Sequence, residues 1–320
     1  MRFTCKLKCL ALVLALLVLA GCGAKPAAQS DTSSPEALAK DAAAFLLKTD
    51  AASGSDWSAF ALARWDGEAA QSWLEGYAAA AEARIAECGG VLHERKYTEY
   101  SRLTLALTAL GKDATQAAGY NLLLPLADFD QTVYQGINGA VTALLALDCG
   151  SYAIPENPAA STQATRELYL QYILAAQLPA GGWALSGEEA EIDLTAMALQ
   201  ALSGYHDRGE VAQAIDKALA ILSQRQNSRG GYTSYNADSS EAVSQTIIAL
   251  ATLGISLDDP RFVKDGNTLL DALLDFRRED GGFAHLLEGK TDLLATEQAL
   301  LALTALVRMN QGDAPLYQIR

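Results

Sequence analysis

Cysteine, histidine and positive charge are all scarce in this chain of 320 residues. It holds five cysteines and three histidines, and no pair of cysteines has the spacing of metal ligands, so we expect no metal site and no cofactor. Lysine and arginine number 24 against 38 aspartates and glutamates, which gives a formal net charge of −14. Such a charge repels phosphate backbones and anionic headgroups, so the composition excludes nucleic acid as a partner.

Long hydrophobic runs and strand-like alternation are rare as well. The one long apolar run, Leu10 to Ala20, is too short to cross a bilayer as a helix. No segment alternates apolar and polar residues convincingly over the length of a strand. We therefore expect a helical chain, with short β pairs at most near glycine turns.

The apolar run follows three basic residues, which is the arrangement of a secretory signal. It ends in Leu-Ala-Gly-Cys22, which resembles a bacterial lipobox and implies a signal peptide over 1–21 and a lipid on Cys22. The small, polar residues 22–35 would then form a flexible tether. We expect an extracytoplasmic lipoprotein, anchored in the membrane by this lipid at the cell surface or on the periplasmic face. The alternative is an ordinary secretion signal with a chance cysteine.

A short helical signature, Ala-Leu-x-[Ala/Thr]-Leu, recurs six times after this segment, and the first copy is degenerate. The copies start at Ala61, Ala106, Ala143, Ala198, Ala249 and Ala302. Their intervals of 37 to 55 residues each hold two helices and two turns, which indicates a repeat architecture. The expected helix pairs are 37–47 with 57–65, 71–88 with 98–110, 117–126 with 138–147, 165–177 with 192–202, 211–226 with 241–253, and 260–277 with 294–308.

The second helix of each pair is apolar all round and the first carries one charged face, so the second helices should form an inner layer. We expect an all-α fold in which six inner and six outer helices close into an α6/α6 toroid, a single domain over 36–320. An open helical array is the alternative. The toroid places Cys88 and Cys149 at opposite ends, beyond the reach of a disulfide.

One polar residue stands five positions before each signature. This polar column consists of Asp56, Ser101, Asn138, Asp193, Ser244 and Glu297. We expect it to form a polar ring at one end of the toroid that binds a ligand, together with the neighbouring side chains of Glu99, Tyr100, Arg102, Glu191, Gln245 and Gln298. The alternative is that these residues only cap helices and interact with helix dipoles.

Two stretches carry a resemblance to a known family. The run from Gln177 to Gly181-Gly182-Trp183, repeated from Gln226 to Tyr232, resembles the Gln…Gly-x-Trp repeats of the squalene cyclase and protein prenyltransferase superfamily. The segment from Glu191 to Ala196 is similar to the Asp-rich box of squalene–hopene cyclases. The resemblance covers residues 36–320, extends to bacterial cell-surface lipoproteins of that superfamily, and implies an α6/α6 toroid.

The resemblance does not decide the chemistry. It implies a terpene cyclase with Asp193 as general acid, yet Glu191 and Leu194 replace the flanking aspartates of the box. Prenyl transfer would need a zinc-binding cysteine and thioester chemistry a Cys-Gly-Glu-Gln core, and both are missing. A carboxylate-based glycan hydrolase stays open. The leading hypothesis is binding without catalysis of a small amphipathic ligand, a glycan or a protein.

Overall fold

The computed structural model describes residues 34–234 and 237–319. The predicted signal peptide, the predicted lipidation site Cys22 and nearly all of the predicted tether lie outside these residues. The described residues form twelve α-helices and five short 3₁₀ turns, so the expectation of a mainly helical chain is confirmed.

The helices are bounded as follows. The α-helices are α1 (Pro35–Leu46), α2 (Asp56–Asp66), α3 (Gln71–Glu87), α4 (Thr98–Ala109), α5 (Phe129–Thr132), α6 (Ile137–Cys149), α7 (Arg166–Ala175), α8 (Ile192–Leu202), α9 (Gly209–Arg225), α10 (Ser240–Thr252), α11 (Leu269–Leu274) and α12 (Leu293–Gln311). The 3₁₀ turns are η1 (Ala51–Ser53), η2 (Pro125–Ala127), η3 (Val133–Gln135), η4 (Ser203–Tyr205) and η5 (Pro260–Phe262).

Two small antiparallel sheets accompany the helices, so the chain is not purely α-helical. Strand β1 (Thr233–Ser234) pairs with β2 (Ala237–Asp238), and β3 (Phe283–Ala284) pairs with β4 (Thr291–Asp292). Strand β1 begins directly after the run Gly230-Gly231-Tyr232, and β3 begins at Phe283, the aromatic residue of the run Gly281-Gly282-Phe283, where the sequence allowed short β pairs. The all-α expectation is corrected in this respect.

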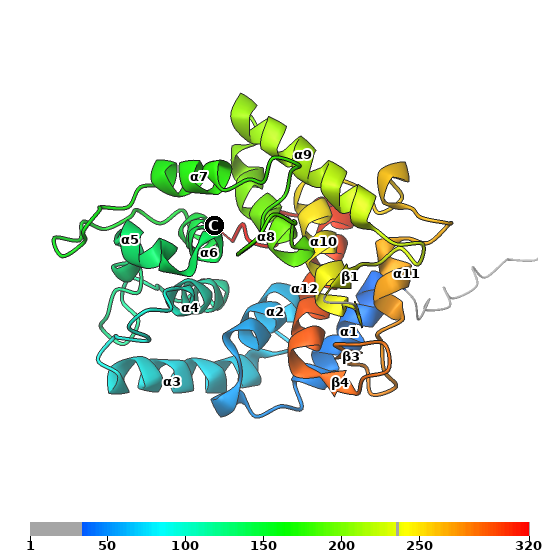
Figure 1. Ribbon diagram of the computed structural model, residues 1–320. Coiled ribbons are helices and arrows are strands. Elements are labelled where there is room, and N and C mark those ends of the chain that lie inside the picture. The colour runs from blue at the N-terminus through cyan, green and yellow to red at the C-terminus, as the bar shows by residue number, and fades with distance from the viewer. Residues whose placement is uncertain (1–33, 235–236, 320) are drawn as a thin grey trace, which may run out of the picture. The chain divides into compact units, whose positions relative to one another are not determined.

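Six helices, α2, α4, α6, α8, α10 and α12, form the inner layer. Each contacts the next one along the chain, and α12 contacts α2. They are buried around most of their circumference; in α10 every residue from Ser240 to Ala251 is buried. Helices α3, α7, α9 and α11 lie at the periphery (Figure 1), and α9 buries only one face, as an outer helix should.

The outer helices pack on different inner helices from the ones expected. Helices α7, α9 and α11 pack chiefly on the inner helix that precedes them, which is α6, α8 and α10 respectively, and α1 packs on α12. The expectation that each outer helix pairs with the inner helix after it is therefore wrong. One cause is the short connection from α8 to α9, because short connections leave consecutive helices adjacent.

Two expected outer helices are largely absent. Residues 117–126 form turns, because the backbone at Ala118 and Gly119 takes positive φ angles of 49° and 86°. The segment 260–277 is interrupted at Asp265 and Gly266, whose φ angles are 50° and 86°, and only η5 and the six-residue α11 remain. A left-handed pair of this kind ends a helix.

The glycine turns join one outer element to the next. A Cβ at Gly181 would lie 2.7 Å from the Lys217 carbonyl oxygen of α9, and one at Gly230 would lie 2.4 Å from that of Thr268, which caps α11. The third turn repeats the pattern, because a Cβ at Gly281 would lie 2.9 Å from the Asp41 carbonyl oxygen of α1. Only glycine allows this approach.

The aromatic residues after two of these glycine pairs fix the outer helices. The Trp183 indole donates to the Ile173 carbonyl (2.7 Å), and the Tyr232 hydroxyl donates to the Leu222 carbonyl (3.1 Å). Gln177 donates to the Ala214 carbonyl of α9 at 2.8 Å. The aromatic residues therefore tie each turn to the helix before it through buried hydrogen bonds, and Gln177 links α7 to the next outer helix, α9.

Candidate functional site

The polar column does not form one open ring. Asp56, Ser101, Ser244 and Glu297 are buried, Asn138 is half-buried, and Asp193 is exposed at the start of α8. The side chains one position later on four helices behave differently, because each residue turns the side chain by about 100° around a helix axis. These later positions, Trp57, Arg102, Gln245 and Gln298, face a shared space.

This space, which we call the N-end cavity, has a volume of about 210 Å³. Every inner helix contributes to its wall from its first turns. One residue from each, in chain order, is Trp57, Arg102, Asn138, Met197, Gln245 and Gln298. The six helices thus point the same way, with their N-terminal halves around one cavity.

Asp56 holds the arginine of this cavity in place. Its carboxylate accepts from the Tyr77 hydroxyl (2.6 Å), from Arg84 (2.9 Å) and from Arg102 Nε (3.1 Å). Burial and the neighbouring Asp56 raise the pKa of Tyr77 above its usual range. Arg102 also donates to Glu99 through Nη2 at 2.5 Å. Asp56 and Glu99 therefore orient Arg102 and do not themselves line the cavity.

Glu297 joins the two ends of the series of inner helices. Its Oε1 accepts from the Ser55 hydroxyl at 2.5 Å and from the Ser58 hydroxyl, so α12 is bonded to the start of α2. Burial raises the pKa of Glu297, an effect that the two serine hydrogen bonds and Arg102 oppose. This column member contributes to packing between helices.

Three glutamines form a chain across the inner helices. Gln200 Nε2 donates to Gln245 Oε1 (2.9 Å) and to the Gln245 carbonyl (3.0 Å), and Gln245 Nε2 donates to Gln298 Oε1 (3.2 Å). The chain connects α8, α10 and α12. It fixes the orientation of Gln245 and Gln298, two of the three amides that line the N-end cavity.

The remaining predicted site residues lie elsewhere. Neither Asp193 nor Glu191 lines the N-end cavity; burial, and to a lesser extent Asp193, raises the pKa of Glu191. Tyr100 is buried, its hydroxyl accepts from the Leu92 amide (3.0 Å), and burial raises its pKa. The hydroxyls of Ser101 and Ser244 are buried with no hydrogen-bond partner in the described part of the chain.

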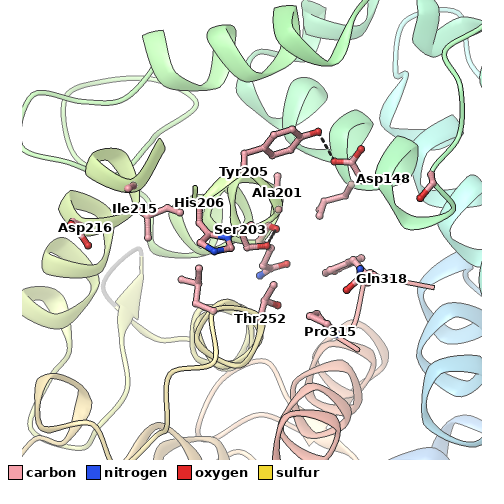
Figure 2. A pocket seen from close by; sticks show the side chains of 17 residues that line it. Asp148, Ala201, Ser203, Tyr205, His206, Ile215, Asp216, Thr252, Pro315 and Gln318 are labelled. Carbon is pink, nitrogen blue, oxygen red and sulfur yellow. Dashed lines mark hydrogen bonds between the residues drawn. The ribbon is translucent and has the colours of Figure 1, made fainter. Parts of the chain in front are cut away.

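A larger pocket, which sequence analysis missed, lies at the other ends of the inner helices. This C-end pocket has a volume of about 730 Å³ and takes residues from the last turns of α6, α8 and α10, from α9 and from the C-terminal segment (Figure 2). Asp148 and Ser203 each lie five positions after the first residue of a signature, whereas the residues of the polar column lie five positions before it. That weak signal recurs in too few copies to have identified the pocket.

The C-terminal segment separates the two cavities. Tyr317 and Leu145 line both of them, and the Tyr317 ring stacks on Phe60 with 5.3 Å between ring centroids. Arg64 donates to the carbonyls of Leu316 (2.8 Å), Pro315 and Gln318 and so holds this segment. Burial, with the nearby Arg308, lowers the pKa of Arg64 to about 10.

The described residues lack the features of two further classes of site. They contain no group of three histidine, cysteine, aspartate or glutamate side chains that could hold a metal ion. Within the same residues, no helix combines the length and apolar character that crossing a membrane requires.

No protein-family model matches the chain, and no curated protein matches it in sequence.

Proposed function

We propose that this chain is an extracytoplasmic, lipid-anchored binding protein whose α6/α6 toroid holds a small hydrogen-bond-accepting molecule in the N-end cavity. The location rests on the basic and apolar N-terminal segment and on Cys22 in its lipobox-like context. The squalene cyclase and prenyltransferase superfamily remains the family that the glycine–aromatic repeats suggest.

Three packing relations support the toroid over an open array. Helix α12 contacts α2, α1 packs on α12, and the third glycine turn meets the backbone of α1 as the earlier turns meet α9 and the N-terminal cap of α11. The last repeat thus packs on the first repeat in the way that each earlier repeat packs on the one after it. An open array would leave its terminal helices without such partners.

The observation that carries the binding proposal is that all six inner helices supply side chains to one cavity rich in donors. Arg102 and the amides of Asn138, Gln245 and Gln298 line it, and no carboxylate does. The N-terminal halves of the six helices add the positive ends of their dipoles. A carboxylate or another compact acceptor suits this wall, because charge-assisted hydrogen bonds to arginine are strong.

The size of the cavity argues against the cyclase alternative. Its 210 Å³ corresponds to roughly seven water molecules at about 30 Å³ each, whereas pockets for drug-sized ligands span about 300–1,000 Å³. A thirty-carbon isoprenoid does not fit, and Asp193 is exposed, while a strong acid for alkene protonation needs a dry site. A hydrolase lacks support here too, because Asp56 and Glu297 are already bonded to protein groups.

The test is untargeted mass spectrometry of small molecules that co-purify with the full chain. Gln298→Met keeps the side-chain volume and removes the amide from the cavity wall, so it should lose most of the bound ligand. The matched variant Asp193→Asn changes an exposed group outside the cavity and should retain the ligand. Loss in Asp193→Asn with retention in Gln298→Met would contradict the proposal and favour chemistry at Asp193.

A further inference from the structure

We propose that the C-end pocket is a second, separate binding site, which takes an amphipathic molecule carrying a protonated amine. Its volume of about 730 Å³ falls in the range of small-molecule sites. Figure 2 shows side chains from α8, α9, α10 and the C-terminal segment around one hollow, with Asp148 and Asp216 at opposite sides of it. The inference does not depend on the N-end cavity.

The apolar part of the wall suits the body of such a molecule. Leu145, Ile215 and Tyr317 are buried side chains that line the pocket, and Ala201 and Leu253 lie beside them. These residues come from three helices, a turn and the C-terminal segment, so the apolar surface is assembled from distant parts of the chain. A ligand body placed there removes apolar surface from water.

The carboxylates are the permanent charges among the side chains that line the pocket. Asp148, Asp216 and His206 line it, and no lysine or arginine is among the lining residues. Arg166 pairs with Asp148 at 2.7 Å and Arg261 interacts with Asp216 from outside the lining, so part of this negative charge is balanced. The last turns of α6, α8 and α10 add the negative ends of their dipoles, which favour a cation.

Three of the five hydroxyl groups that line the wall have already used their protons. Ser203 donates to the Gln200 carbonyl (2.7 Å), Thr252 donates to the Ile248 carbonyl (2.7 Å), and Tyr205 donates to Asp148 (2.8 Å). These three oxygens therefore face a ligand only as acceptors. A molecule with several N–H groups complements them.

Gln200 supplies the observation that points to a ligand independently of charge. Its side chain lines the pocket at 3% exposure, and its Oε1 is buried with no hydrogen-bond partner in the described residues. Its Nε2 is fully engaged by Gln245, so the amide is fixed with the acceptor left over. An unpaired buried acceptor is unfavourable, and a donor from a ligand would satisfy it.

The experiment compares two probes of equal shape and opposite charge, benzylamine and benzoate, by calorimetric titration of the full chain. Benzylamine should bind the C-end pocket at least about ten-fold more tightly than benzoate binds it, since both the acceptors and the charge favour the amine. Asp216→Lys should reduce benzylamine affinity by about ten-fold or more. The matched variant Asp207→Lys, at an exposed position outside the pocket, should change it by less than about two-fold.

A second pair of variants tests the location by steric means. Ala212→Trp places a large ring in the pocket and should abolish benzylamine binding, whereas Ala220→Trp, on the exposed face of the same helix, should leave it intact. If Ala212→Trp does not fold, the Asp216→Lys result decides alone. No binding of benzylamine, benzoate binding of equal affinity that Ala212→Trp also abolishes, or insensitivity of benzylamine binding to these variants would overturn the inference. Asn138→Leu removes an amide of the N-end cavity that lies outside the glutamine chain and should not affect benzylamine binding, so this inference and the proposed function can fail separately.

Discussion

The two ends of the inner helices present opposite chemistry to solvent. The N-end cavity is small and lined by donors from Arg102 and three side-chain amides, whereas the C-end pocket is more than three times larger and lined by carboxylates and acceptor oxygens. The difference follows from helix direction, because six parallel helices expose N–H groups at one end and carbonyl groups at the other. The side chains reinforce the polarity that the backbone sets.

The ends also differ in what holds them. Glycine turns and the hydrogen bonds of Asp56 and Glu297 surround the N-end, whereas the C-terminal segment, held by Arg64, closes the C-end. A repeated local motif therefore builds one end and a single non-repeated segment builds the other. The following variants perturb the ends one at a time.

The largest effect is expected where the two cavities meet. Tyr317→Ala removes a buried ring that stacks on Phe60 and separates the cavities, so it should lower the free energy of unfolding by about 3–5 kcal/mol. Urea denaturation measures this change. Leu185→Ala, at a side chain that is 58% exposed, serves as the control and should change stability by less than about 0.5 kcal/mol.

A glycine substitution should break the N-end framework next. In Gly230→Ala the new Cβ would lie 2.4 Å from the Thr268 carbonyl oxygen, at a φ of 78°, so we expect a loss of about 2–4 kcal/mol from strain and overpacking. Gly254→Ala has a similar φ of 69° but nothing within 4 Å of the new atom, and should lose only about 1 kcal/mol. Equal losses in thermal or urea unfolding would show that the turns do not pack as described.

Asp56→Asn tests the polar support of Arg102. The variant removes the charge that pairs with Arg84 and Arg102, and because both arginines are partly exposed, the loss of stability should be about 1–2 kcal/mol. Benzylamine affinity at the C-end should stay unchanged in calorimetric titration, since neither Asp56 nor its partners Tyr77, Arg84 and Arg102 line the C-end pocket. A loss of benzylamine affinity together with the loss of stability would show that the N-end and the C-end are coupled.

The smallest effect concerns pH. The pKa of Glu297 is raised in the folded state, so its contribution to stability is fully present below the pKa of the unfolded chain and is lost as pH rises through the raised pKa. Glu297→Gln keeps an acceptor for Ser55 and Ser58 and removes this titration. The variant should therefore gain stability relative to the wild type as pH rises above about 4.3, measured by urea unfolding across pH 4 to 8. A flat difference would contradict a buried, titrating Glu297.

Sequence analysis predicted the six repeated inner helices and failed at two outer segments, where the local backbone conformation interrupts the expected helix. All six inner helices lie where the apolar signatures predict them. A helix that is apolar all round is stable only when it is buried, so its sequence indicates its place in the inner layer. The outer segments 117–126 and 260–277 were mispredicted because left-handed Ala118-Gly119 and Asp265-Gly266 interrupt them. Their apolar content alone resembled that of a helix.

The residues proposed for a site meet only in part. Of these residues, Arg102, Asn138, Gln245 and Gln298 line the N-end cavity, whereas most of the polar column does not. Whether Asp56 or Trp57 faces the cavity depends on the rotation of α2 about its axis. A residue pattern fixes this rotation only to within one position. The C-end pocket could not be predicted, because it depends on the return of the C-terminal segment between distant helices.

The most direct test of the central claim uses the indole N–H signals of the tryptophans in a ¹H–¹⁵N NMR titration with benzoate. Among the described residues, Trp57 lines the N-end cavity, whereas Trp183 is buried behind a glycine turn. The account predicts that benzoate shifts the Trp57 signal in a saturable way and leaves the Trp183 signal in place, and that Gln298→Met weakens the effect. An unchanged Trp57 signal at saturating benzoate would contradict the claim that the N-end cavity binds small acceptor molecules.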